Sequence, residues 1–566
     1  MSMQKKTEQL ERERVRLAGC AADRIKKPVE GPLRRMDPFR EKTDDTEGGG
    51  PLKTDPGREK TAAERQHAAG KYTARERIGL FMDPGSFHEI GLFARHQCMD
   101  FGMDKKEIPA DGVVTGYGRV DGRKVFVYAQ DFTAYGGSIG KMQALKICRV
   151  LDMAAEAGAP VIGINDSGGA RVQEGVDALA GIGEIFRRLV DNSGRIPQIS
   201  MIMGPCAGGA AYAPAMTDLV VMRKGQGLMF CTGPGVIRDV TGEAVDAQAL
   251  GGAKMHAERS GEADLAAETE EEAFALVRQV LGYLPSSCME KPPRRAYGKK
   301  AGSGENAQLK PELEMIEPDD TELRPMLETI VPDESRKPYD MLDVIAQIAD
   351  RESFLELQPL FADNLITGFA RIGGRPVGIV ASQPYVMAGC LDLDASDKGA
   401  RFVELCSSFH IPLISLVDVP GFLPGVDQEQ RGLLRHGARM LSAFAAAKVP
   451  RITVILRKAY GGAYMAMCSR EMGADLVFAW PGAEIAVMGA ESAVNLLYSR
   501  EIAKAEDPEA ARAELVEKYR EKFSTPYFAA ARGYIDEIIR PQETRERIIE
   551  ALDIFAEAYK GGMTGK

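Results

Sequence analysis

The chain has 566 residues, of which 44% are hydrophobic and 27% are charged, and its formal net charge is −10. This length exceeds what one hydrophobic core usually supports, so we expect two or more domains. The negative charge argues against a nucleic-acid partner, and no apolar run reaches the roughly 18 residues that cross a membrane, so we expect no direct membrane insertion.

Cysteine and histidine usage argues against a metal site. The nine cysteines include no Cys-x-x-Cys pair, and the six histidines show no ligand spacing. We therefore expect no bound metal and a reduced, cytoplasmic setting. The N-terminal stretch MSMQKKTEQLERERVRL mixes acids with bases and has no apolar centre, which is typical of neither a secretory signal nor a transit peptide.

The first part of the chain divides into an extension and a globular domain. Residues 1–70 are charged and turn-rich, and we predict a poorly packed N-terminal extension that could serve as an arm for a partner. Residues 71–285 are predicted to form the first domain. Within it, residues 113–120 and 124–129 are predicted to form two strands, because Asp121-Gly122 between them is a strong hairpin signal.

Strands and helices then alternate, which indicates an α/β layered fold. The apolar spacing predicts a helix over 141–157, a buried strand over 160–164, a loop over 165–171, a helix over 179–190, a strand over 199–203 and a loop over 204–209.

The second half of the chain repeats this order. Gly168 precedes Gly208 by 40 residues, and Gly421 precedes Gly461 by 40 residues, so the two halves are offset by about 253. The predicted elements are a hairpin over 368–381, helices over 396–409 and 430–447, strands over 412–417 and 451–456, and loops over 418–425 and 457–464.

Residues 286–338 are rich in Pro, Glu and Lys and are predicted to form an interdomain linker. The second domain is predicted over residues 339–566. Its last part, residues 508–558, is predicted to be helical, with a break at 524–526.

The glycine loops are the candidate sites of chemistry. Adjacent glycines at strand-to-helix turns expose backbone N–H groups, which suit a phosphate or a carbonyl oxygen that becomes negative during reaction. One glycine pair alone favours tight packing as its role, but four loops in two matched pairs favour binding. The sequence contains no P-loop, no dinucleotide-binding fingerprint and no Gly-x-Ser-x-Gly elbow.

Several acids are candidate general bases or structural groups. Asp166, Glu174 and Asp418 could act as bases, although an acid at the start of a helix, such as Glu174, commonly caps it. Asp218 and Asp475 recur before a predicted strand in each half. We predict that this recurring pair holds turns and does no chemistry.

Four motifs carry a family resemblance. They are DSGGARVQEG at 166–175, MGPCAGGA at 203–210, VPGFLPG at 419–425 and RKAYGGAY at 457–464. Together they closely resemble the carboxyltransferase β subunits of biotin-dependent acyl-CoA carboxylases, with the propionyl-CoA carboxylase group nearest. The resemblance extends from about Gln66 to the C-terminus.

The resemblance implies a tandem duplication of a crotonase-like (ClpP/crotonase) β-β-α domain. It also implies transfer of a carboxyl group between carboxybiotin and the α-carbon of a short or modified acyl-CoA, most simply propionyl-CoA. The expected partners are biotin carboxylase and a biotin carboxyl carrier. The expected assembly is a homo-oligomer, a dimer at minimum and commonly a hexamer, with each active site between the N-terminal domain of one subunit and the C-terminal domain of another.

The resemblance further implies two oxyanion holes. Gly168, Gly169 and Ala170 would face the enolate of the acyl-CoA, and Gly462 and Ala463 would face the ureido oxygen of biotin, so no protein base is required. The residues expected to bind substrate or cofactor are Gly136, Gly137, Ser138, Arg171, Ala207, Gly208, Gly209, Pro420, Gly421, Phe422, Tyr464 and Met465.

Two departures bear on the function. Met465 stands where propionyl-specific members carry an acid, in a position that lines the acyl pocket. No Ala-Met-Lys-Met site is present, so biotin must arrive on a separate protein or subunit. Three alternatives stay open: the carboxyltransferase subunit of a sodium-pumping decarboxylase acting on methylmalonyl-CoA or glutaconyl-CoA, a biotin-independent hydratase or isomerase, and a non-catalytic scaffold.

Overall fold

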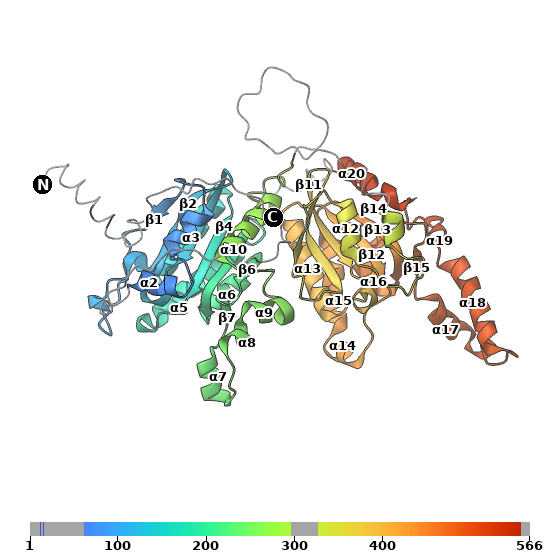
Figure 1. Ribbon diagram of the computed structural model, residues 1–566, viewed down its shortest axis with the longest axis horizontal. Coiled ribbons are helices and arrows are strands. Elements are labelled where there is room, and N and C mark those ends of the chain that lie inside the picture. The colour runs from blue at the N-terminus through green and yellow to red at the C-terminus, as the bar shows by residue number, and fades with distance from the viewer. Residues whose placement is uncertain (1–11, 13–14, 16–60, 296–325, 556–566) are drawn as a thin grey trace, which may run out of the picture.

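The computed structural model describes residues 61–295 and 326–555, together with Arg12 and Val15. Two mixed sheets of eight strands lie side by side, one in each half of the chain (Figure 1). In the described part of the chain, no helix is both long enough and apolar enough to cross a membrane. Most of residues 1–60, half of the predicted linker (296–325) and the C-terminal residues 556–566 lie outside the described residues.

The first sheet has the strand order β1-β2-β3-β4-β5-β6-β8, and β7 pairs with β5. The strands from β3 onward run parallel, whereas β1, β2 and β3 are antiparallel neighbours. Their bounds are β1 (His88–Ile90), β2 (Val113–Val120), β3 (Arg123–Gln130), β4 (Val161–Ser167), β5 (Gln198–Ala207), β6 (Leu219–Arg223), β7 (Leu228–Phe230) and β8 (Leu265–Ala267).

The second sheet has the matching order β9-β10-β11-β12-β13-β14-β16, and β15 pairs with β13. The bounds are β9 (Leu355–Leu357), β10 (Leu365–Ile372), β11 (Arg375–Ser382), β12 (Leu413–Val419), β13 (Arg451–Tyr460), β14 (Leu476–Ala479), β15 (Glu484–Ala486) and β16 (Glu537–Ile538). Strand for strand, this sheet repeats the first. The predicted α/β fold with an internal duplication is therefore confirmed, as are both predicted hairpins.

The helices cover the faces of the sheets and link their strands. In the first half they are α2 (Ala62–Ala68), α3 (Ala74–Phe81), α4 (Lys141–Ala157), α5 (Val176–Asn192), α6 (Gly209–Ala215), α7 (Pro234–Thr241), α8 (Ala247–Gly251), α9 (Ala253–Met255) and α10 (Glu270–Tyr283). In the second half they are α11 (Leu327–Ile330), α12 (Met341–Ile348), α13 (Leu393–Ser408), α14 (Val426–Gln430), α15 (Leu433–Ala446), α16 (Gly461–Ala466), α17 (Ala490–Ile502), α18 (Pro508–Phe523), α19 (Pro526–Ala530) and α20 (Thr544–Phe555).

The predicted helix over 141–157 coincides with α4, because glycines flank a clear apolar spacing. Gly140 precedes the helix, and Gly158 ends it in the left-handed conformation with φ of +57°. By contrast, α2 lies before the predicted start of the first domain at residue 71. Gln66 of α2 is buried, so folded structure begins before residue 71.

All four predicted loops are wrong in their first residues, which belong to strands: residues 165–167 are the end of β4, and residues 418–419 are the end of β12. Residues 204–207 are the end of β5, and residues 457–460 are the end of β13. β5 and β13 each extend beyond their apolar run because a short extra strand, β7 or β15, pairs with these last residues. Short helices, α6 and α16, then replace the remainder of the predicted loops that follow β5 and β13.

The C-terminal region is also less helical than predicted. The break at 524–526 separates α18 from α19 as expected, but β16 follows and adds a strand to the second sheet. The pattern did not reveal this strand because it is only two residues long.

The two halves pack together along α10. The ring of Tyr283 stacks on Phe369 with centroids 5.6 Å apart, and Arg371 Nη2 donates to the carbonyl oxygen of Gly282 at 2.6 Å. One hydrophobic core cluster contains buried residues of both halves. The halves are therefore joined by packing as well as by the chain.

An ionic cluster lies at the same junction. Arg401 of α13 reaches across to Asp264, with Nη2 3.4 Å from Oδ2, and its guanidinium also interacts with Asp218 and Glu262. Burial raises the pKa of Asp218 and of Glu262 to about 7 in each case, and burial also raises the pKa of Asp264. Three carboxyl groups thus face one cation, which favours a proton on at least one of them.

This cluster predicts a pH dependence of stability. Because the pKa of Asp218 rises from 3.8 to about 7 on folding, the folded chain holds a proton that the unfolded chain has lost over that window. The contribution to the free energy of unfolding is therefore full below about pH 4 and is lost as the pH rises through 7. We expect Asp218→Asn, measured by denaturant unfolding at pH 5 and pH 7.5, to reduce the pH-dependent loss by more than about 1.4 kcal/mol.

The matched control is Asp191→Asn, an exposed acid paired with Arg187 on α5. It should leave the pH dependence as it is in the unaltered protein. An Asp218→Asn variant with the same pH-dependent loss as this control would contradict the assignment of the proton to the cluster.

Candidate active site

The predicted glycine loops lie at the carboxyl ends of the parallel strands in both sheets, where open α/β folds usually bind ligands. In the first half, the loop after β4 lies against the loop after β3. The N–H of Ile139 donates to the carbonyl oxygen of Gly169, and the N–H of Arg171 donates to that of Ile139, both at 2.8 Å. This parallel bridge leaves Ala170, between the two bonds, with its N–H turned away from Ile139.

The second half repeats this bridge at an offset of 252 residues. The N–H of Leu391 donates to the carbonyl oxygen of Gly421 at 3.1 Å, and the N–H of Leu423 donates to that of Leu391 at 2.7 Å. Phe422 therefore has the position that Ala170 has in the first half. In the described chain, neither the N–H of Ala170 nor that of Phe422 meets a protein acceptor.

A short helix begins beside each bridge. Gly209 and Ala210 open α6, and Gly461 and Gly462 open α16. The N–H groups of a first helical turn have no acceptor within the helix. Each half thus presents one loop amide and one helix-start amide at the same edge of its sheet.

The loop and the helix start are in close contact in each half. A Cβ on Gly169 would lie 2.8 Å from the carbonyl oxygen of Ala207, and φ there is +97°, so only glycine fits. In the second half, a Cβ on Gly462 would lie 3.5 Å from the ring of Phe422, which is ordinary contact. Gly168 and Gly462 are both exposed to solvent.

This arrangement corrects part of the predicted donor set. The N–H of Gly168 is already used by the carbonyl oxygen of Gly136 at 2.9 Å, and the N–H of Gly169 lies 3.2 Å from Ser167 Oγ. Of the three predicted first-half donors, only Ala170 has an unused N–H.

The other predicted binding residues gather at the same two edges. Gly136, Gly137 and Ser138 follow β3, and Ser138 Oγ donates to the carbonyl oxygen of Tyr135 at 3.0 Å. Pro420 and Gly421 follow β12 directly. The structure therefore brings the predicted loops of each half together.

On α16 the predicted residues differ in accessibility. Ala463 is fully buried, so of the two predicted second-half donors only Gly462 is open to solvent. Tyr464 is largely buried, and burial raises its pKa well above the ordinary value. Met465 is 43% exposed.

The three candidate bases are occupied by structural partners. Asp166 is fully buried, and its carboxylate accepts from Lys71 Nζ at 2.9 Å, Arg77 Nη1 at 2.8 Å and Gln66 Nε2 at 3.2 Å. Its role in the first half is to anchor α2 and α3 to the end of β4.

Asp418 is the equivalent of Asp166 in the second half and is also fully buried. Its carboxylate accepts from Arg457 Nε at 2.9 Å and from the backbone N–H of Lys458 at 3.1 Å. Glu174 accepts from the N–H of Lys141 at 2.7 Å, so it caps α4. None of the three is free to act as a base.

The repeated acids Asp218 and Asp475 hold strand starts. Asp218 Oδ2 accepts from the N–H of Gln198 at 2.7 Å, and Asp475 Oδ2 accepts from the N–H of Arg451 at 2.8 Å. Their predicted structural role is confirmed.

Arg171 has a different place from the one predicted. Its side chain is fully buried, and Nη1 donates to Asp111 Oδ1 at 2.5 Å and to Glu174 Oε1 at 2.8 Å. Nη2 donates to the carbonyl oxygen of Ser138 at 2.8 Å. The guanidinium therefore fastens the loop after β4 to the loop after β3, and its contact with substrate stays a prediction.

A pocket of about 460 Å³ lies beside α6. Its walls are mainly apolar, with a few polar groups among them. The lining residues are Ala211, Tyr212, Ala215, Met229, Phe230, Cys231, Thr232, Ile237, Leu250, His256, Ser260 and Glu262. Among the described residues, no group of three or more His, Cys, Asp or Glu side chains could hold a metal ion.

Comparisons with known proteins agree on one family. The model of the carboxyl transferase domain matches residues 65–560. The chain is 52% identical to the carboxyltransferase subunit of propionyl-CoA carboxylase from Haloferax mediterranei, over 93% of this chain and 97% of that one. It is also 52% identical to the methylmalonyl-CoA decarboxylase subunit alpha from Veillonella parvula, over 87% of this chain and 92% of that one.

A solved structure gives the same result. The crystal structure of transcarboxylase 12S, described as a hexamer assembly with methylmalonyl-coenzyme A bound, matches with a TM-score of 0.82 and 50% identity. The match covers 89% of this chain and 93% of that one.

The buried network around Arg171 predicts a large loss of stability when it is broken. Arg171→Leu places in the first half the residue type that Leu423 has in the second. Because it leaves Asp111 and Glu174 without their cation, we expect the free energy of unfolding to fall by about 3–5 kcal/mol in denaturant titration. Arg171→Lys should restore part of this loss.

Arg187→Leu is the control, since that guanidinium pairs with Glu184 and Asp191 on an exposed helix face. Its effect should stay below about 1 kcal/mol. A loss in Arg171→Leu no larger than in this control would show that the buried network does not hold the loop.

Proposed function

The chain belongs to the carboxyl transferase family, as an acyl-CoA carboxyltransferase subunit of the propionyl-CoA carboxylase group with two crotonase-like halves, and we propose that it exchanges the carboxyl group with biotin borne by a separate carrier. The observation that carries this proposal is the pair of matching amide sets, one in each half. Two sets of N–H donors suit a reaction with two carbonyl oxygens to stabilise.

In the first half, the thioester oxygen of the acyl-CoA would accept from Ala170 and from the start of α6. Removal of the α-proton turns that oxygen into an enolate oxygen, and each fixed N–H donor is worth on the order of 3 kcal/mol to such a charge. The apolar pocket beside α6 would receive part of the substrate. A short acyl-CoA of the propionyl type is the substrate we favour.

In the second half, the ureido oxygen of biotin would accept from Phe422 and Gly462. An acceptor suits this site because the amide of Phe422 has no acceptor in the described chain and Gly462 is exposed. Biotin, when bound, supplies the carboxyl group and is the site to which it returns. This chain's own residues orient that oxygen and leave room for the ring.

The proposal also fits the hydrogen bonding of the three candidate bases. Asp166, Glu174 and Asp418 are all held by partners, which disfavours a hydratase or isomerase that relies on paired acids. The exposed amides repeated in both halves disfavour a purely structural scaffold, because a scaffold has no need for them.

Exposed apolar side chains around the two edges support a site shared between subunits. On α7, Val236 and Val240 are 55% and 78% exposed, and on α17, Leu496 and Leu497 are 70% and 62% exposed. Figure 1 shows α7 and the α17–α18 pair extending away from the two halves. Exposed apolar patches mark protein contacts. We propose a dimer at minimum, and a hexamer like that described for transcarboxylase 12S.

A second direction of reaction has equal support from similarity. The Veillonella parvula decarboxylase subunit is as identical to this chain as the Haloferax mediterranei carboxylase subunit. Carboxylation and decarboxylation need the same two amide sets. The proteins that supply biotin therefore decide the direction.

An assay of the assembled complex tests the direction. With its biotin carboxylase and carrier present, we expect ATP-dependent incorporation of labelled bicarbonate into propionyl-CoA. Sodium-stimulated release of CO₂ from methylmalonyl-CoA by a membrane-bound complex, without ATP-dependent fixation, would instead assign the chain to a decarboxylase.

Gly462→Val tests the role of the second half. A Cβ here would meet the Phe422 ring at ordinary contact distance, so the fold should persist while the added bulk crowds the exposed amide. We expect carboxyl transfer to fall at least about 10²-fold, whereas acyl-CoA binding measured by calorimetry stays unchanged.

The matched control is Gly79→Val on the exposed face of α3, where a Cβ meets nothing within 4 Å. This variant should keep full activity. Normal transfer in Gly462→Val would overturn the assignment of the two halves. Loss of acyl-CoA binding in that variant would overturn it as well.

A further inference from the structure

A second cavity lies at the opposite edge of the second sheet from the glycine loops. It has a volume of about 120 Å³ and lies where parallel strands begin: Arg375 and Pro376 start β11, Pro412 precedes β12, and Pro450 precedes β13. The candidate active site lies where these strands end. The two sites are therefore separate.

The wall formed by residues 288–295 is held in place by hydrogen bonds to the second half. His410 Nε2 lies 2.6 Å from the carbonyl oxygen of Cys288, and Arg371 Nη1 donates to that of Pro293 at 2.9 Å. The N–H of Arg295 donates to the carbonyl oxygen of Gly374 at 3.0 Å. The cavity is thus a formed feature of the junction between the halves.

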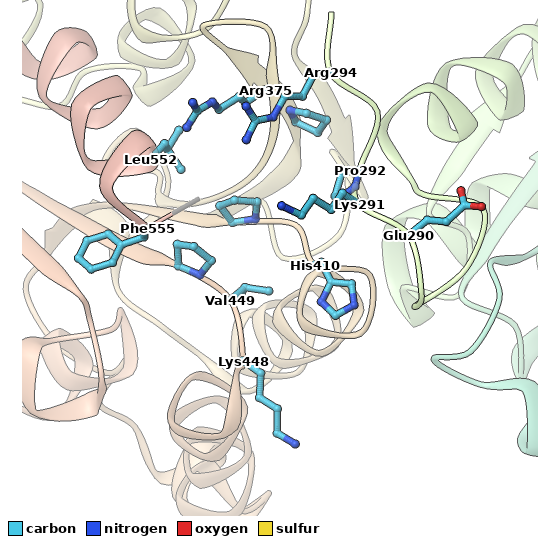
Figure 2. A pocket seen from close by; sticks show the side chains of 13 residues that line it. Glu290, Lys291, Pro292, Arg294, Arg375, His410, Lys448, Val449, Leu552 and Phe555 are labelled. Atoms are coloured by element: carbon cyan, nitrogen blue, oxygen red, sulfur yellow. The ribbon is translucent and has the colours of Figure 1, made fainter. Parts of the chain in front are cut away.

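Cations outnumber acids around this cavity. Figure 2 shows Lys291 extending into it between Arg375 and His410, with Arg294 beside Arg375, while Glu290 points away. The acid that pairs with Arg375 is Asp553 of α20. This leaves an excess of positive charge facing the cavity.

Arg375 itself has unused hydrogen-bonding capacity. Its Nη1 is buried and meets no acceptor among the described residues. Burial and the neighbouring guanidinium of Arg294 lower the pKa of Arg375. An anion placed here would relieve the repulsion between the guanidinium groups of Arg375 and Arg294.

The rest of the lining is apolar and partly flat. Pyrrolidine rings form much of it, and a leucine and a phenylalanine of α20 close one side. These residues are Pro292, Pro376, Pro412, Val449, Pro450, Leu552 and Phe555. An inorganic ion would leave this surface uncovered.

We propose that the cavity binds a small organic oxyanion, in which a carboxylate or phosphate joined to an apolar or planar group meets Arg375 and Lys291 while that group lies against the prolines and Phe555. A guanidinium binds either oxyanion through two parallel hydrogen bonds. The cavity is lined by the segment that follows α10 and also by α20. An occupant would therefore stabilise the junction between the halves.

The test is calorimetric titration of the full chain with three probes: adenosine diphosphate, phenylacetate and inorganic phosphate. We expect at least one organic probe to bind saturably and at least about tenfold more tightly than inorganic phosphate, because its apolar part is also buried. Arg375→Ala and Lys291→Ala should each weaken that binding at least about tenfold through loss of a charge-assisted hydrogen bond.

Lys448→Ala is the matched control, because this lysine borders the same cavity but its amine points away in Figure 2. It should leave the affinity unchanged. Melting without probe checks folding, and if Arg375→Ala does not fold, Lys291→Ala decides alone. The proposal is overturned by the absence of saturable binding at millimolar concentration, by inorganic phosphate binding equally well, by equal weakening in Lys448→Ala, or by binding that survives both Arg375→Ala and Lys291→Ala.

Discussion

The parallel bridge between neighbouring loops is the interaction on which the site depends. In the loop after the central strand of each half, one residue accepts a hydrogen bond from the neighbouring loop, and the residue two positions later donates one to it. The residue between them must therefore turn its N–H outward. An unused amide is costly when buried and valuable when a substrate oxygen reaches it. The bridge thus fixes a donor with backbone atoms alone, and no side chain has to be held in position.

Buried ion pairs hold the loops that form these bridges, and the ion pairs differ between the halves. Arg171 fastens the first loop through Asp111 and Glu174, whereas the corresponding residue in the second half is Leu423. Both halves nevertheless bury an aspartate at the end of the central strand, neutralised by Arg77 and Lys71 or by Arg457. Acids near the amides therefore serve the scaffold, which is consistent with a reaction that needs no protein base.

Much of the fold follows from local sequence signals, whereas the roles of individual amides do not. The apolar spacing between Gly140 and Gly158 defines α4, and Asp121-Gly122 defines the first hairpin. Ile139 decides which amide in the run from Gly168 to Ala170 stays unused. This residue lies about 30 positions away in the sequence and is brought next to the loop only by the fold. The structural role of Arg171 could not be predicted for the same reason, because its partner Asp111 is distant in sequence.

The most direct test of the account is a crystal structure of the assembled protein with an unreactive thioester analogue of propionyl-CoA. The account predicts the thioester oxygen within about 2.7–3.1 Å of the amide of Ala170 and of an amide at the start of α6. A thioester oxygen found instead at Phe422 and Gly462, or held by side chains alone, would contradict the assignment of the first half to the acyl-CoA.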